Sequence, residues 1–333
     1  MSFDLTRSNL FATTFYSLVL IVVFWGSGAA ILVSPMRTVA IEEYWLSQTL
    51  NDMIDAWPVL CQIVAALMAF VCSLMVARLA IRNVLYLERT YMPSLLFVII
   101  SSTFYVAARS ILPIIVAFLV LRAMSLIFQS YQIKNIASGI YLSAGFYFGV
   151  AAAIYPPSAY LVLMLFVGLG IFRLSDIREW IAAGVGFLLP LGLFFYIMWL
   201  MGHDVVHQAM LYWQQLNWHD TIDTVWRGLT VIDYTLIGVI CALVFMSYVV
   251  FLRSRKRYKL RGVLSYNYLF CFLLWSVAVM LVSPSRSLYL LPVVAIPLSV
   301  LIPTYFASGR STFLSNFLYA LLILSSIAIH FVR

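Results

Sequence analysis

Three of the four histidines in the chain lie within one hydrophilic segment, residues 202–228. His203 and His207 are four residues apart and would share one face of a helix, with Asp204 beside them. The spacing is similar to the zinc pattern H-E-x-x-H, but aspartate replaces glutamate and no third ligand is identified. We therefore expect no bound metal and no cofactor. The three residues are interpreted either as ligand-binding groups or as part of an interfacial helix with an aromatic belt.

Charged residues beside long apolar stretches form a second group of candidates. Arg109, Asp233 and Arg286 occupy such positions, where a charge is unfavourable unless it is paired or faces water. Asp233 could pair with either arginine, which would make the group structural. Alternatively, the two arginines serve a ligand. The sequence leaves both interpretations open.

The composition decides which solvent surrounds these residues. Of 333 residues, 64% are hydrophobic and 10% are charged, and the mean hydropathy is +1.03, whereas a soluble domain carries about 25% charged residues. A water-soluble fold of this length could not hide so much apolar surface. The net charge of +8 comes without a patterned basic and aromatic surface, so we expect no nucleic-acid partner. The sequence predicts an all-α polytopic membrane protein.

Apolar stretches of about 20 residues predict the membrane-spanning helices. Residues 135–172 are long enough for two spans and contain Tyr155-Pro156-Pro157 in the middle, where the prolines disfavour helix. The whole chain, 1–333, is interpreted as a single transmembrane domain of about eleven spans, at residues 12–33, 58–77, 91–108, 111–129, 136–155, 158–172, 181–201, 230–252, 264–282, 288–305 and 313–331.

The distribution of basic residues predicts the orientation. With the N-terminus in the cytoplasm, fifteen Lys and Arg residues fall on the cytoplasmic side and five on the outer side, as the positive-inside rule favours. The C-terminus is then outside. Segments 34–57 and 202–228 become outer loops, and residues 253–262 become a basic cytoplasmic loop that anchors the topology against anionic lipid.

The first outer loop predicts an amphipathic helix lying on the membrane surface. Apolar residues recur at helical spacing and acidic residues lie elsewhere on the helical wheel; the apolar set is Leu46, Leu50, Met53, Ile54 and Trp57, and the acidic set is Glu42, Glu43, Asp52 and Asp55. In the second outer loop, Tyr212, Trp213 and Trp218 are expected at headgroup depth. Both hydrophilic excursions are thus predicted on the same face of the membrane.

The stretch from Tyr91 to Gly202 carries a set of motifs. They are Tyr91-Met92-Pro93, Ser143-Ala144-Gly145-Phe146-Tyr147-Phe148-Gly149, Ile154-Tyr155-Pro156-Pro157 and Arg178-Glu179-Trp180. Together they resemble an uncharacterised family of bacterial multi-pass inner-membrane proteins. Some members carry a carotene-oxygenase label. We reject that label, because such oxygenases hold iron with four histidines of a soluble β-propeller.

The same stretch resembles, more loosely, glycosyltransferases of the GT-C fold, which use lipid-linked sugar donors. This resemblance implies a catalytic acid on the first outer loop, where Glu42 and Glu43 stand, to activate an acceptor hydroxyl. It also implies a phosphate site, for which Arg109 and Arg286 offer planar bidentate donors, with the loop 202–228 alongside. The outer loop between the third and fourth spans is too short for a second acidic motif.

Three functions follow from these observations. The first is a multi-pass inner-membrane protein of the cell envelope that binds or acts on lipid-linked sugars at the outer face. The second is a non-enzymatic scaffold subunit of an envelope assembly or export complex, with membrane-protein partners. The third, a transporter, is less favoured because no relay of acidic residues and histidines crosses the bilayer centre. In each case the lipid bilayer is an expected partner, and in the first so is a lipid-linked sugar donor.

Overall fold

The computed structural model describes residues 10–26, 45–86, 90–103, 111–131, 137–172, 176–216, 231–282, 287–307, 320–324 and 326. Within these ranges all regular secondary structure is helical. The α-helices are α1 (Leu10–Gly26), α2 (Trp45–Ala56), α3 (Pro58–Arg82), α4 (Met92–Ser102), α6 (Ile111–Gln129), α7 (Ala137–Ile154), α8 (Leu163–Ile171), α9 (Ile177–Leu200), α10 (Val205–Leu216), α12 (Val231–Ser254), α13 (Leu260–Val282), α14 (Leu291–Leu301) and α15 (Pro303–Ala307). Short 3₁₀ helices are η3 (Pro156–Val162), η4 (Arg255–Arg257) and η5 (Ser287–Leu290).

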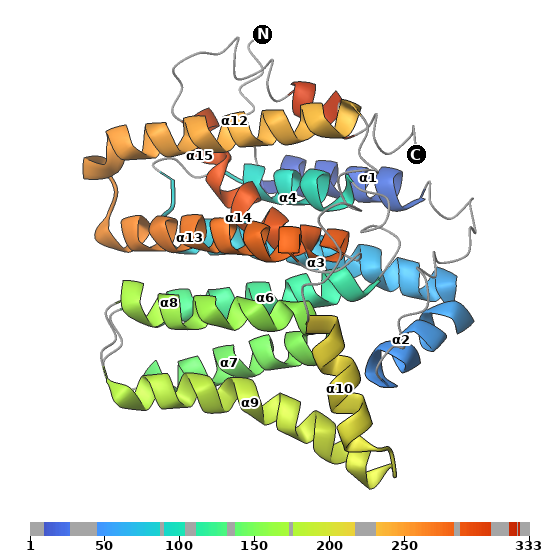
Figure 1. Ribbon diagram of the computed structural model, residues 1–333. Helices are drawn as coiled ribbons and strands as arrows, with labels where there is room; N and C mark the ends of the chain where they lie inside the picture. The colour runs from blue at the N-terminus through green and yellow to red at the C-terminus, as the bar shows by residue number, and fades with distance from the viewer. Residues whose placement is uncertain are drawn as a thin grey trace.

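Six of the described helices are long and apolar enough to cross a membrane by length and composition. They are α3, α6, α7, α9, α12 and α13, and each coincides with one predicted span. Four other predicted spans overlap shorter apolar helices, and 313–331 lies largely outside the described residues. The long helices lie roughly side by side, whereas α2 and α10 stand at one end of the bundle (Figure 1). The all-helical class is therefore confirmed, and the count of eleven spans remains a prediction.

The helices α7 and α9 pack together more extensively than any other pair in the described structure. A Cβ atom added at Gly145 would lie 2.5 Å from the backbone oxygen of Ala183, and one added at Gly149 would collide with the backbone of Phe187 and the ring of Pro190. Small residues let the two backbones approach this closely, as is common between membrane helices. The glycine-rich motif is thus explained by packing.

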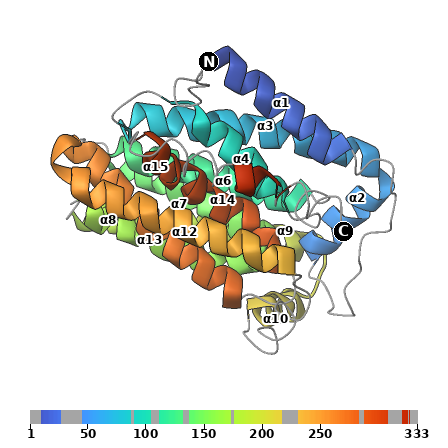
Figure 2. The same cartoon turned by 90° about the horizontal axis from the view of Figure 1, so that it is seen from above.

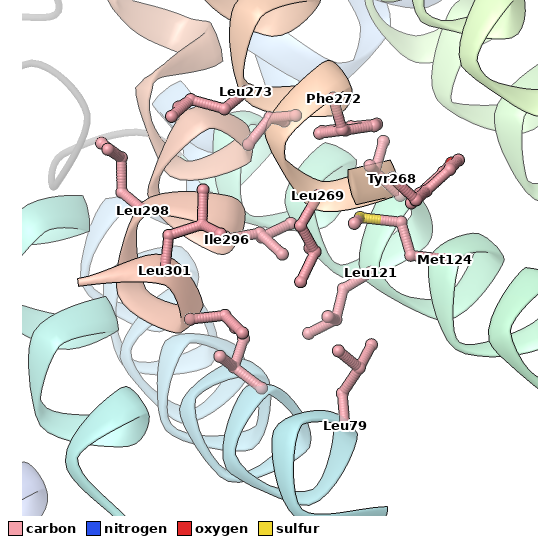
Figure 3. Packing of buried hydrophobic residues seen from close by; sticks show 14 of the residues in the cluster. Leu79, Leu121, Met124, Tyr268, Leu269, Phe272, Leu273, Ile296, Leu298 and Leu301 are labelled. Atoms are coloured by element: carbon pink, nitrogen blue, oxygen red, sulfur yellow. The ribbon is translucent and has the colours of Figure 1, made fainter. Parts of the chain in front are cut away.

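Two short helices occupy the centre of the bundle. Every residue of α4 and of α14 is buried, and the two helices pack against each other. Figure 2 shows α4 between the pair α1 and α3 on one side and α14 and α12 on the other. Around α14 the core is built from leucine, isoleucine and aromatic side chains of α3, α6 and α13, among them Leu79, Leu121 and Tyr268 (Figure 3).

The end of α14 shows how such a bundle accommodates proline. Pro303 has no N–H, and the helix stops at Leu301 before α15 begins. The hydroxyl of Tyr86 donates to the Val300 carbonyl at 2.6 Å, and the hydroxyl of Ser247 donates to the Leu301 carbonyl. In lipid, backbone groups freed by a helix break must find partners inside the protein. These two hydroxyls provide them.

The predicted turn between α7 and the following helix is present. α7 ends at Ile154, Tyr155 has extended backbone angles, and the chain continues from Pro156 as a 3₁₀ helix before α8 begins. The span predicted at 158–172 is therefore a composite of η3 and α8. The consecutive prolines explain why α7 ends here, because neither has an N–H to donate to the carbonyls of its last turn.

Candidate functional site

The connection between α9 and α10 is a tight turn centred on Gly202. The N–H of Gly202 donates to the Trp199 carbonyl at 3.1 Å, and the N–H of His203 donates to the Met198 carbonyl at 3.2 Å. These two bonds form a Schellman motif, which places Gly202 in the left-handed region, with a φ of +81°. Glycine adopts this conformation without strain. α9 therefore ends where the sequence supplies glycine.

Asp204 begins the next helix. Its Oδ1 accepts hydrogen bonds from the N–H of Val206 at 3.0 Å and of His207 at 3.4 Å. An aspartate in this position satisfies donors that the first turn of a helix leaves free. His203 consequently lies before α10 and His207 within it, so the prediction that they share one helix face is wrong. The physical reason is that the Gly202 turn and the Asp204 cap divide the segment between them.

Trp45, the first residue of α2, contacts this turn. Its backbone N–H donates to Gln208 Oε1 on α10 at 2.9 Å. Its ring lies 5.8 Å from the ring of His203 and 6.5 Å from the ring of Phe194, measured between centroids. These contacts join parts of the chain 163 residues apart. We call this contact of Trp45 with His203, Phe194 and Gln208 the α2–α10 junction.

Apolar side chains lie beneath the junction. A small cluster includes Ala153 from the end of α7, Phe194 and Met198 from α9, and Leu211 from α10, with Trp45 packed against it. The two predicted surface helices therefore meet over the same ends of α7 and α9. α2 and α10, which belong to the segments 34–57 and 202–228, thus lie at the same end of the bundle; that both segments face the outer side of the membrane remains a prediction.

Two hydrogen bonds attach α10 to the bundle, and a third ties its partner Tyr160 to α13. The hydroxyl of Tyr212 donates to the Ala152 carbonyl at 3.2 Å, and that of Tyr160 donates to the Leu216 carbonyl at 2.9 Å. Trp275 of α13 donates its Nε1–H to the Tyr160 carbonyl at 2.8 Å. Burial raises the pKa of the Tyr212 hydroxyl well above its usual value, so this donor stays protonated at any physiological pH.

The predicted site residues are only partly described. His203, Asp204 and His207 are exposed at the junction. Glu42, Glu43, Arg109 and Arg286 lie outside the described residues. The two arginines are the proposed partners of Asp233, which is buried in the first turn of α12. Among the residues that the structure describes, no group of three or more His, Cys, Asp or Glu side chains could hold a metal ion.

Exposed aromatic residues gather at this end of the bundle. Trp199 and Tyr196 on the last turns of α9, Trp213 on α10 and Trp57 before α3 are all exposed. Tryptophan and tyrosine concentrate where lipid headgroups meet the hydrocarbon layer, because one end of each ring is polar. This distribution favours the interpretation of 202–228 as an interfacial segment. The sequence had not identified Trp45 or Gln208 as contact residues.

Regular structure that is all helical in the described residues, with six candidate membrane-spanning helices among them, defines a class, the helical membrane proteins. Within that class, residues 54–332 match a family of unknown function, DUF6427. The match covers most of the chain, so the protein belongs to this family. The matched region begins at residue 54, after Glu42, Glu43 and Trp45. No curated protein matches the chain, and no solved structure matches it.

Proposed function

We propose that the protein is a multi-pass inner-membrane protein of the cell envelope that binds, and acts on, a lipid-linked sugar at the α2–α10 junction. The observation that carries the proposal is the contact of Trp45 with His203 and Gln208. Glu43 precedes Trp45 by two residues. In the sequence, the acidic pair thus comes just before Trp45, the residue that contacts the turn carrying His203.

The chemistry of a lipid-linked sugar fits this location. Such a donor has a long apolar chain, an anionic phosphate at the membrane surface and a sugar just above it. The exposed rings of Trp199 and Trp213 offer apolar faces at headgroup depth, and Arg109 and Arg286 would hold the phosphate. Glu42 or Glu43 would accept the proton of the attacking hydroxyl.

The test replaces both acids without changing their shape. In the native host, we expect E42Q/E43Q to accumulate polyprenyl-linked sugar in membrane extracts as strongly as deletion of the protein does, because glutamine cannot accept the proton. The matched control is D52N, which removes an exposed carboxylate from α2 itself. Mass spectrometry of the extracted lipids and immunoblotting of membrane levels give the readout. Wild-type lipids in E42Q/E43Q cells at normal protein levels would contradict the catalytic role.

The alternative, a non-enzymatic scaffold subunit, is favoured by how the junction uses its polar groups. Asp204 caps α10, Gln208 holds the backbone of Trp45, and His203 packs on the Trp45 ring. Each of these side chains already has a structural role. If deletion changes the envelope, E42Q/E43Q does not, and purification in mild detergent yields a stoichiometric partner, this function replaces the first.

A further inference from the structure

Arg261, in the first turn of α13, is held against the end of α6. Its Nη2 donates to the Phe128 carbonyl at 3.1 Å, and the centre of its guanidinium lies 5.8 Å from the centroid of the Tyr131 ring. The side chain is half-buried, and its Nε has no hydrogen-bond partner among the described residues. An arginine donor without an acceptor is unfavourable. The guanidinium is thus fixed in place and incompletely satisfied.

A second arginine, Arg82, lies on the end of α3 that contacts the first turn of α13. Arg82 ends α3 and is exposed, and its charge acts on Arg261. The approach is enforced by the backbone: a Cβ atom at Gly262 would lie 2.8 Å from the Val84 carbonyl oxygen, so the first turn of α13 presses on the residues that follow Arg82. Two positive charges held near each other repel. An anion between them would remove that repulsion.

The charged residues that neighbour Arg261 in the sequence are all basic. Five exposed basic residues lie in the last turn of α12 and in its connection to α13, namely Arg253, Arg255, Lys256, Arg257 and Lys259. The sequence has no aspartate or glutamate after Asp233. α13 and α14 therefore carry no carboxylate, and Asp233, the one acid of α12, lies in its first turn, at the other end of that helix. Among the described residues no acidic side chain acts on Arg261, Glu179 of α9 included, so the partner that fits is an anion from outside the chain.

We propose that Arg261 and Arg82 form a binding site for the phosphate of an anionic phospholipid headgroup. The site lies where apolar helices end: α3, α6 and α12 terminate and α13 begins around it, and the α12–α13 connection stands at the end of the bundle away from α2 and α10 (Figure 1). Tyr131 and Tyr258, both half-buried there, are typical of headgroup depth. Phosphate oxygens accept the paired donors of a guanidinium with good geometry.

A purely structural role explains part of this arrangement. An arginine that donates to the last carbonyls of α6 stabilises that helix end. That role accounts for the bond to Phe128 but gives no reason for Arg82 to lie alongside. The exposed basic residues would attract anionic lipid in general, whereas Arg261 and Arg82 belong to helices far apart in the sequence whose ends are in contact. The inference is independent of the function proposed for the α2–α10 junction.

The experiment measures lipid binding to the purified full-length protein in detergent by native mass spectrometry. Phosphatidylglycerol, phosphatidylcholine and inorganic phosphate are the probes. We expect R261Q to weaken phosphatidylglycerol binding about tenfold and R82Q about fivefold, because each variant loses a charged hydrogen-bond donor to the phosphate. The matched control is R122Q, which removes an exposed arginine from α6 and should change binding less than twofold.

The choice of variants separates a loss of lipid binding from a loss of folding. R261Q also removes the bond to Phe128, so a loss of folding is checked by its melting temperature, and R82Q, on an exposed side chain, leaves the packing intact. Equal loss in R82Q and R122Q would overturn the proposal in favour of diffuse attraction. Equal binding of phosphatidylcholine would overturn it as well. Displacement of the lipid by millimolar inorganic phosphate would assign the site to free phosphate and also overturn the lipid headgroup as its ligand.

Discussion

The interface between α7 and α9 and the α2–α10 junction lie next to each other, yet they are held by different forces. In the interface, glycine brings backbone against backbone, and the atoms a larger side chain would meet are carbonyl oxygens and a proline ring. At the junction, two surface helices are joined by one hydrogen bond and by ring contacts. The comparison indicates that the interface carries the stability of this end of the bundle. The junction has far less stability of its own.

The largest effect is expected at Gly149. We expect G149L to destabilise the protein by on the order of 3 kcal/mol, because the backbone of Phe187 and the ring of Pro190 cannot move aside as flexible side chains would. Thermal unfolding in detergent, followed by size-exclusion chromatography, measures the loss. The control is G192A on α9, where an added Cβ would meet nothing within 4 Å. It should be neutral or raise stability by up to about 1 kcal/mol. Equal melting of the two variants would remove the distinction between the regions.

An intermediate effect is expected at Trp45. W45A removes the ring contacts with His203 and Phe194 but keeps the backbone N–H that binds Gln208. We expect a loss of about 1–2 kcal/mol confined to the junction. Amide exchange in α2 should then be faster by about tenfold, while the melting temperature of the bundle stays unchanged. Exchange measured by mass spectrometry, with W213A as the exposed control on α10, tests this. A fall in melting temperature as large as that of G149L would contradict the comparison.

Sequence patterns anticipated the elements better than their contacts. Apolar length alone predicts α3 and α12, and helical spacing predicts the surface helix α2, because these features depend on neighbours in the chain. Which helix packs against a glycine motif depends on the tertiary structure. The sequence therefore showed Gly149 as part of a motif but not its contact with α9. The bond between Trp45 and Gln208 joins distant parts of the chain, and its geometry leaves no local signal.

The histidine segment is a different case, because its outcome was within reach of the sequence. Glycine after a long apolar run is typical of a helix end, and aspartate two residues later is typical of a helix start. Gly202 and Asp204 fulfil both roles. The four-residue spacing of His203 and His207 predicted a shared helix face only because the start of α10 between them was not recognised. Arg261 is part of the basic run in the sequence, but in the structure its side chain contacts the end of α6.

The smallest effect, at Asp204, separates the structural use of the junction from its proposed chemistry. D204A should remove the cap of α10 and cost about 1 kcal/mol. The amides of Val206 and His207, which donate to Asp204 in the wild type, should then exchange about fivefold faster.

D204N keeps the cap, since asparagine caps as well as aspartate, but removes the charge. If Asp204 serves a ligand, D204N disturbs the lipid-linked sugars of the host while its amides exchange as in the wild type. If Asp204 is a cap alone, D204N behaves as the wild type in both measurements, and the polar groups of the junction are then explained by the docking of α2 on α10.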